Sequence, residues 1–272
     1  MLQIHQKYGP VVRVGPNTVF YSHPDATKEI RGHRKGNQVE HQKDPHLHFG
    51  NQNNAIGANR ENHTRYRRSL AYGFSHQAML DQEPIINRYI DTLLNELKKA
   101  SMIKEKIDIE LTFKELASNA SLLIAAGSET TATALSAATY YLGLHREAFM
   151  KLADEVRSSF TSEGEITITN VQHLNYLQAV IDEAMRLFPS TPGTAPRIIS
   201  SGGDTIAGRY VPAGTVVGVW QWVNHHNPSH FLEAESFIPE RWLGDTRFKN
   251  DVRDAFLPFS IGPRNCVGRK YV

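Results

Sequence analysis

The hydrophobic positions near the start of the chain predict a β-hairpin, a short helix and a long loop. Between Tyr8 and Ser22, two runs of β-branched and aromatic residues flank the turn-forming sequence Gly15-Pro16-Asn17, a pattern typical of a small hairpin. A short helix begins at Pro24-Asp25. The polar stretch at 31–62 is rich in His and Asn and has no periodicity, so we expect it to be a loop.

Helical periodicity dominates the rest of the chain. Helical segments are predicted at 62–99, with a break near 82–84, and then at 147–160 and 174–188, where Pro189 ends the last helix. Two short β runs within 205–219 flank Val211-Pro212-Ala213-Gly214 and predict a small sheet with a turn. The fold class is therefore mainly α with minor β.

The longest apolar segment, Ala117 to Leu144, contains Glu129 as its only charged residue. As a helix it would be about 42 Å long, which is enough to cross a membrane. However, it is dense in Ala and Gly and carries many Ser and Thr residues. Together with the ionisable Glu129, these residues favour a helix buried in the middle of a soluble protein over a membrane span.

Composition and charge exclude several classes of protein. With 40% hydrophobic and 21% charged residues over 272 positions, the chain is globular and fits one large domain or two ordinary ones. Its net charge of +2 does not indicate a nucleic-acid partner. The single cysteine, Cys266, excludes an internal disulfide and any metal site with several cysteines. The first residues carry no signal peptide or apolar anchor.

The surroundings of Cys266 favour a chemical role over the usual role of a lone cysteine as a small buried hydrophobe. Gly262 and Gly268 flank the sulfur and let a flat, bulky group approach the backbone. Arg264 lies two residues before Cys266, and the sequence after it can begin a helix. A nearby cation and a helix N-terminus both stabilise a thiolate.

This segment, residues 259–268, resembles the cysteine loop of the cytochrome P450 family at its Phe, both Gly, Arg and Cys positions. The resemblance implies that Cys266 is the thiolate ligand on the proximal face of a haem iron. It also implies that Gly262 and Gly268 make room for the macrocycle, that Phe259 packs near the sulfur, and that Arg264 pairs with a haem propionate.

A second resemblance concerns three charged residues. Glu183 and Arg186 are three positions apart on one helix face, although an isolated pair of this kind is usually a weak surface bridge. The sequence Pro239-Glu240-Arg241-Trp242 resembles the family element whose arginine completes a buried triad with such a pair. The resemblance implies that Glu183, Arg186 and Arg241 brace the fold behind the cysteine loop and are not catalytic.

The segment 126–131 of the apolar helix resembles the family's oxygen-activation segment. The resemblance implies that small residues let the helix pass over the iron, and that Glu129 and Thr130 are catalytic residues that deliver protons through water. The alternative is a helix-packing Gly127 beside an incidental acid and hydroxyl.

Two further pairs resemble haem-propionate ligands of the family. His63 and Arg67 are four residues apart and share a helix face, although the family more often has a Trp in place of this His. Arg197 follows Pro196 in the position of another propionate-binding arginine. With Arg264, these residues would neutralise two carboxylates, for which guanidinium groups are well suited. The remaining histidines lie without recurring acidic partners and predict loop or packing positions, not a metal site: His41, His46, His48, His225, His226 and His230.

The resemblance is greatest to fungal members of the family that act in secondary metabolism, but this chain is shorter. We expect a single partial cytochrome P450 domain over 1–272, with a long central helix, a cysteine-ligand loop and small β-sheets. An internal deletion is expected near 100–107, where the helices that roof the substrate pocket are missing, and a truncation is expected after 272. The N-terminal membrane anchor of the family is also absent from this sequence.

The resemblance implies a haem-thiolate monooxygenase that inserts one oxygen atom of O₂ into an apolar small molecule. Its electrons would come from NADPH through a reductase partner. The implied location is intracellular, at the surface of the endoplasmic reticulum. Two alternatives remain: a truncated, catalytically inactive remnant with weak or no haem binding, and a membrane-spanning interaction protein built on 117–144, which leaves the Cys266 motif unexplained.

Overall fold

The computed structural model describes residues 1–34, 39–44, 53–71 and 112–271. Its backbone contacts divide the chain into two compact units. The larger unit comprises residues 1–49 and 126–266, and the smaller unit comprises residues 50–125 and 267–272. The predicted helix over 72–99 and the expected deletion near 100–107 lie outside the described residues.

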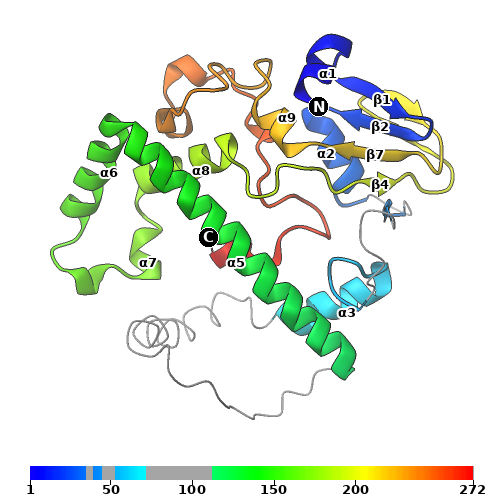
Figure 1. Cartoon of the computed structure of the whole chain (residues 1–272), viewed down its shortest axis with the longest axis horizontal. Helices are drawn as coiled ribbons and strands as arrows, with labels where there is room; N and C mark the ends of the chain where they lie inside the picture. The colour runs from blue at the N-terminus through cyan, green and yellow to red at the C-terminus, as the bar shows by residue number, and fades with distance from the viewer. Residues whose placement is uncertain (35–38, 45–52, 72–111, 272) are drawn as a thin grey trace. The chain divides into compact units, whose positions relative to one another are not determined.

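The described part of the chain is mainly helical with small sheets, which confirms the predicted fold class (Figure 1). Its α-helices are α1 (Leu2–Tyr8), α2 (Pro24–Arg31), α3 (Arg60–Ala71), α5 (Phe113–Leu144), α6 (Arg146–Ser159), α7 (Ile168–Val171), α8 (Asn175–Leu187) and α9 (Gln221–His225). Short 3-10 helices are η1 (Glu163–Glu165), η2 (Pro239–Leu243), η3 (Thr246–Phe248), η4 (Arg253–Ala255) and η5 (Val267–Tyr271). The strands are β1 (Val11–Gly15), β2 (Thr18–Tyr21), β3 (Gln42–Lys43), β4 (Arg197–Ile198), β5 (Asp204–Ile206), β6 (Arg209–Val211) and β7 (Val216–Val219).

The main sheet of the larger unit has the strand order β1-β2-β7-β4-β3. Strands β1 and β2 form the predicted hairpin, with Val11 opposite Tyr21 and a register shift before Gly15. Strand β7 pairs in parallel with β2 and antiparallel with β4. The two-residue strand β3 pairs with β4 and places Lys43 opposite Arg197. The sheet thereby joins the start of the chain to a segment more than 150 residues away.

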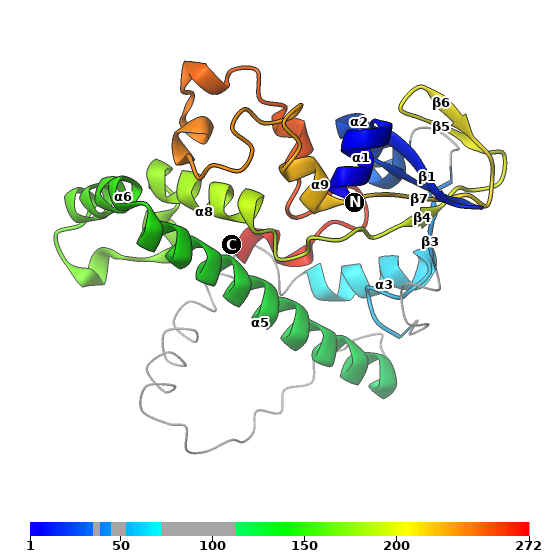
Figure 2. The ribbon, with the colours of Figure 1, turned by 45° about the horizontal axis from the view of Figure 1, so that its top comes forward.

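The predicted small sheet within 205–219 is wrong in its pairing. Strand β6 pairs with β5 in a separate two-stranded sheet, whereas β7 lies inside the main sheet (Figure 2). Burial explains the difference, because Val217 and Val219 are buried while Arg209 and Tyr210 are exposed. A strand that is apolar on both faces is stable in a sheet interior, and a polar one is stable as an exposed hairpin.

Two hydrophobic clusters form the core of the larger unit. The first packs α2 against the sheet through Ala26, Ile30, Tyr21, Val217 and Val219. The second lies where α5, α6 and α8 meet. Helix α8 contributes Tyr176, Val180, Ala184 and Leu187 to it, a spacing that places them on one face of the helix.

Helix α5 has 32 residues and is not buried on all sides, so that prediction is wrong for the described structure. Ala137 is buried, but Ile124 is 72% exposed and Leu135 is 60% exposed. The sequence carries apolar residues around most of the helix, but neighbouring elements cover only part of its surface. In the described residues, no helix is long and apolar enough to cross a membrane.

The histidines of the α9 region are packed in the interior. His225 is fully buried, neither of its ring nitrogens has a hydrogen-bond partner among the described residues, and its ring lies near Phe256. Burial, and secondly the charge of Arg186, lower the pKa of His225 to about 3. Its imidazole is therefore neutral at physiological pH. His46 and His48 lie outside the described residues, and His41 contacts Asp204.

His225 should make stability depend on pH. The unfolded chain binds a proton at His225 below about pH 6.5 while the folded chain does not, so stability falls as pH decreases from 6.5. Between pH 7 and pH 5 the wild type should lose about 2 kcal/mol more unfolding free energy than His225→Gln, which removes the titrating group. Denaturant unfolding at both pH values measures this difference, and equal losses in the two proteins would contradict the assignment.

Candidate functional site

Cys266 ends a loop that its own backbone holds closed. The Cys266 N–H donates to the Phe259 carbonyl at 2.9 Å, and the Asn265 N–H donates to the Gly262 carbonyl at 3.2 Å. The side chain of Phe259 is partly buried, whereas Cys266 is a free and exposed thiol. The 3-10 helix η5 begins at the next residue and contains Gly268. The Cys266 sulfur at the end of this loop is therefore exposed.

Gly262 has a structural reason that the sequence did not predict. Its φ is +79°, and a Cβ atom there would lie 1.9 Å from the carbonyl oxygen of Arg31. The space beside this glycine is thus filled by the C-terminal end of α2. Glycine is needed because only an absent side chain permits this close approach.

Two of the predicted propionate ligands belong to one cluster of charged side chains in the larger unit. We call this cluster the basic pocket, and its members are Arg31, Glu40, Lys43, Arg197 and Arg264. The Arg197 side chain is buried and donates to the carbonyls of Ala195 and Pro196 at 2.9 and 3.1 Å. The Nε of Arg264 donates to Glu40 at 3.0 Å, and both of these side chains are largely buried. Strand β3 adds Lys43 to the same place.

Positive charge exceeds negative charge in this pocket. Burial, followed by the charges of Arg31 and Arg264, lowers the pKa of Arg197 to about 9, while the charge of Glu40 opposes this shift. Burial, followed by the charges of Arg264 and Arg197, lowers the pKa of Lys43 to about 7. Burial and the repulsion between these cations both disfavour their charged forms. An anion bound among them would offset both effects.

Sequence reasoning missed Arg31, Glu40 and Lys43. All three fall at or after the end of α2, in the stretch expected to be an irregular loop. No local motif marks them, because the pocket forms only when β3 pairs with β4.

His63 and Arg67 lie on α3 and belong to the smaller unit. His63 is buried and Arg67 is partly buried. Within that unit, α3 is held to the start of α5 by Glu115, which accepts hydrogen bonds from Arg65 and from the Tyr66 hydroxyl. These bonds, with Arg65 foremost, hold the pKa of Glu115 far below its usual range.

The predicted oxygen-activation segment lies in the middle of α5. Glu129 is exposed, and the Thr130 hydroxyl donates to the Ala126 carbonyl of its own helix. The Thr130 carbonyl in turn accepts a hydrogen bond from Ser190 at 2.8 Å, a contact that the sequence did not predict. Among the described residues, a Cβ on Gly127 would meet no atom within 4 Å.

Glu183, Arg186 and Arg241 are brought together in the interior. Arg186 donates to both carboxylate oxygens of Glu183 at 2.9 and 2.8 Å, and Arg241 donates to one of them at 3.0 Å. All three side chains are at most 1% exposed. The bidentate geometry and the burial distinguish this group from a surface ion pair.

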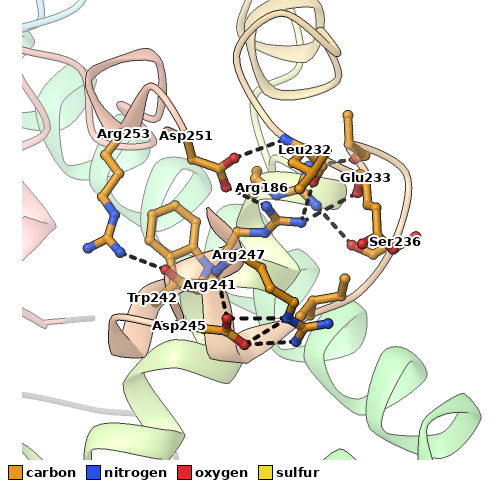
Figure 3. A network of polar contacts seen from close by, with 12 residues as sticks. Arg186, Leu232, Glu233, Ser236, Arg241, Trp242, Asp245, Arg247, Asp251 and Arg253 are labelled. Carbon is orange, nitrogen blue, oxygen red and sulfur yellow. Dashed lines mark hydrogen bonds and ion pairs between the residues drawn. The ribbon is translucent and has the colours of Figure 1, made fainter. Parts of the chain in front are cut away.

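The network extends beyond the predicted triad. Asp251 accepts a hydrogen bond from Arg241, and the Trp242 indole donates to Glu183 at 3.0 Å. The remaining guanidinium N–H groups donate to backbone carbonyls, several of which Figure 3 shows: Leu232, Glu233, Ala234, Ser236 and His225. The two arginines therefore hold the irregular segment after α9 in place on α8.

Comparison with known proteins identifies the relatives of this chain. The sequence profile of the family described as "Cytochrome P450" matches it in two pieces, residues 1–110 and 100–271. A trichothecene C-15 hydroxylase of Fusarium sporotrichioides is 38% identical over 98% of this chain and 77% of the relative. An averantin hydroxylase of Dothistroma septosporum is 31% identical over 98% and 71%, and a cytochrome P450 monooxygenase of Penicillium brasilianum is 30% identical over 100% and 78%.

The alignment with the Fusarium hydroxylase runs over 377 positions, which exceeds the 272 residues of this chain. Part of the aligned region of the relative therefore has no counterpart in this chain.

Replacing Glu183 by Gln should destabilise the ligand-free chain by about 3–5 kcal/mol, because two buried guanidinium groups lose their shared anion. Glu240→Gln is the matched control, since Glu240 pairs with the half-exposed Lys151 and its loss should cost less than about 1 kcal/mol. Denaturant unfolding of both variants gives the comparison. Equal destabilisation would show that the triad is not a structural brace.

Replacing Gly262 by Ala should destabilise the ligand-free chain more than Gly244→Ala. Both glycines have positive φ, +79° and +86°, but a Cβ on Gly244 would meet no atom within 4 Å. Gly244→Ala should therefore cost only the left-handed backbone strain of about 1–2 kcal/mol. Gly262→Ala adds a clash with the Arg31 carbonyl, for which about 1–3 kcal/mol more is expected. Equal unfolding free energies of Gly262→Ala and Gly244→Ala would show that a side chain at position 262 does not clash with the Arg31 carbonyl.

Proposed function

This chain belongs to the cytochrome P450 family, and from that premise we propose that it is a haem-thiolate monooxygenase of fungal secondary metabolism. The observation that carries the proposal is the exposed Cys266 at the end of a backbone-closed loop whose sequence matches the family motif. The substrate is an apolar small molecule into which one atom of O₂ is inserted.

A bound haem would supply the reaction of O₂ with two electrons and two protons, in which one oxygen atom enters a C–H bond of the substrate and the other leaves as water. The electrons come from NADPH through a reductase. This partner, and a location at the surface of the endoplasmic reticulum, are proposed from the family.

The described residues fit a haem. The Cys266 thiolate would hold the iron from an exposed position. Arg197 and Arg264 would bind the two carboxylates, because the pocket around them holds an excess of positive charge over Glu40. His63 and Arg67 on α3 are proposed as further ligands of these carboxylates by their motif, and Phe259, Gly262 and Gly268 as the residues that shape the loop.

Glu129 and Thr130 are proposed to move protons. Glu129 is exposed and can exchange its proton with water. The Thr130 hydroxyl donates to the Ala126 carbonyl, so this hydrogen bond must break before the hydroxyl can donate its proton toward a ligand. Rotation about the Cβ–Oγ1 bond is sufficient to redirect the proton.

The hydroxylase names of two relatives support carbon hydroxylation as the reaction type. The Fusarium relative is named for C-15 of a trichothecene, and the Dothistroma relative for averantin.

A second candidate is an inactive remnant with weak or no haem binding, which an internal deletion near 100–107 would produce. The two-piece family match that overlaps at 100–110 and the alignment that is longer than this chain support such a deletion. The exposed apolar side chains of α5, such as Ile124 and Leu135, support it too, because they lack the cover expected of a substrate pocket.

Carbon monoxide difference spectra of the reduced, haem-supplemented protein test both candidates. The wild type should give a thiolate-type Soret band, and Cys266→Ser should lose it while keeping the same far-UV circular dichroism, because one ligand is removed with little change in volume. A wild type that takes up no haem would support the remnant. A thiolate-type band that persists in Cys266→Ser would refute the ligand assignment.

A further inference from the structure

Arg31, the last residue of α2, has a guanidinium group whose hydrogen-bond partners among the described residues are all neutral oxygens. Its Nη1 lies 3.5 Å from the Ser260 hydroxyl, and its Nη2 lies 3.4 Å from the Thr194 hydroxyl and from the Val219 carbonyl. Its Nε is buried and has no hydrogen-bond partner among the described residues. These contacts are long for hydrogen bonds, and none of them supplies a negative charge.

The charges around Arg31 make this arrangement unfavourable. Arg197 and Arg264 are its neighbours in the basic pocket, and Glu40 is already engaged by Arg264. Burial lowers the pKa of Arg31 to about 10, which still leaves the group protonated at neutral pH. Buried charges in proteins are normally paired, so the pocket is short of an anion at Arg31.

A purely structural role does not account for the charge. Arg31 could tether the cysteine loop through Ser260, but its closest approach to that loop is through its backbone carbonyl, which lies against Gly262. That contact needs no particular side chain at position 31. A neutral amide side chain would also suit the three neutral oxygens.

We propose that Arg31 is an anion-binding residue of this pocket, which together with Arg197 holds a carboxylate group of the ligand. The cysteine-loop and propionate motifs assign no role to position 31. The inference rests on the proposed function only in identifying that carboxylate as a haem propionate. Binding at Arg31 itself requires only a carboxylate that reaches the pocket.

The test compares Arg31→Gln with the wild type for two iron-free ligands, protoporphyrin IX and its dimethyl ester, in absorbance and fluorescence titrations of the full chain. Arg31→Gln should weaken binding of the acid about tenfold or more and leave binding of the ester nearly unchanged, because the ester carries no charge. Arg31→Lys should fall between the two. Arg209→Gln is the matched control, since Arg209 is exposed on β6 and should affect neither ligand.

Thermal unfolding of the ligand-free chain separates binding from folding. Arg31→Gln should leave the melting temperature unchanged or raise it, because it removes a partly buried charge that has no counter-ion among the described residues. A lower melting temperature with equal losses of affinity for acid and ester would show a structural tether and overturn the inference. Equal affinity of the wild type and Arg31→Gln for protoporphyrin IX would also overturn it, while leaving the proposed function intact.

If the wild type binds neither porphyrin, the proposed function fails and a simple dicarboxylate decides the inference. Glutarate should then raise the melting temperature of the wild type more than that of Arg31→Gln, at matched ionic strength. Equal stabilisation of the two proteins would overturn the anion-binding role of Arg31.

Discussion

Arginine side chains that leave water on folding need an anion beside them, and the source of that anion organises the larger unit of this molecule. In the triad the chain supplies it. Glu183 and Asp251 face Arg186 and Arg241 with two negative charges for two positive ones. Backbone carbonyls take the remaining guanidinium N–H groups. A network that is satisfied in this way holds an irregular segment rigidly, because no partner can be exchanged without exposing a buried charge.

The basic pocket also contains arginine side chains, but in it the positive charges outnumber the negative ones. Arg31, Lys43, Arg197 and Arg264 gather there, and Glu40 is the acid that opposes them. Among the described residues, Arg31 and Arg197 donate hydrogen bonds only to neutral oxygens. The triad and the basic pocket therefore differ in their charge balance, although both contain family-like arginines.

The end of α2 connects this pocket to the cysteine loop. The Arg31 carbonyl lies where Gly262 has no side chain, and the Arg31 guanidinium lies in the pocket. A single helix terminus therefore contacts the loop that carries Cys266 and contributes a charge to the basic pocket. The core cluster that packs α2 on the sheet through Ala26 and Ile30 stabilises both arrangements.

Local spacing in the sequence was enough to predict the hairpin, the helix of Glu183 and Arg186, and the turn-rich loop that ends at Cys266, because each depends on hydrogen bonds or faces within a few residues. Tertiary structure decided the rest. Strands β6 and β7 entered different sheets because their burial differs, α5 stayed partly uncovered because few elements pack on it, and Arg31, Glu40 and Lys43 met Arg197 and Arg264 through a pairing between distant strands. Pairing between distant strands leaves no periodic pattern or fixed spacing in the sequence. Which strands pair is therefore decided only when the chain folds and buries its charged side chains together.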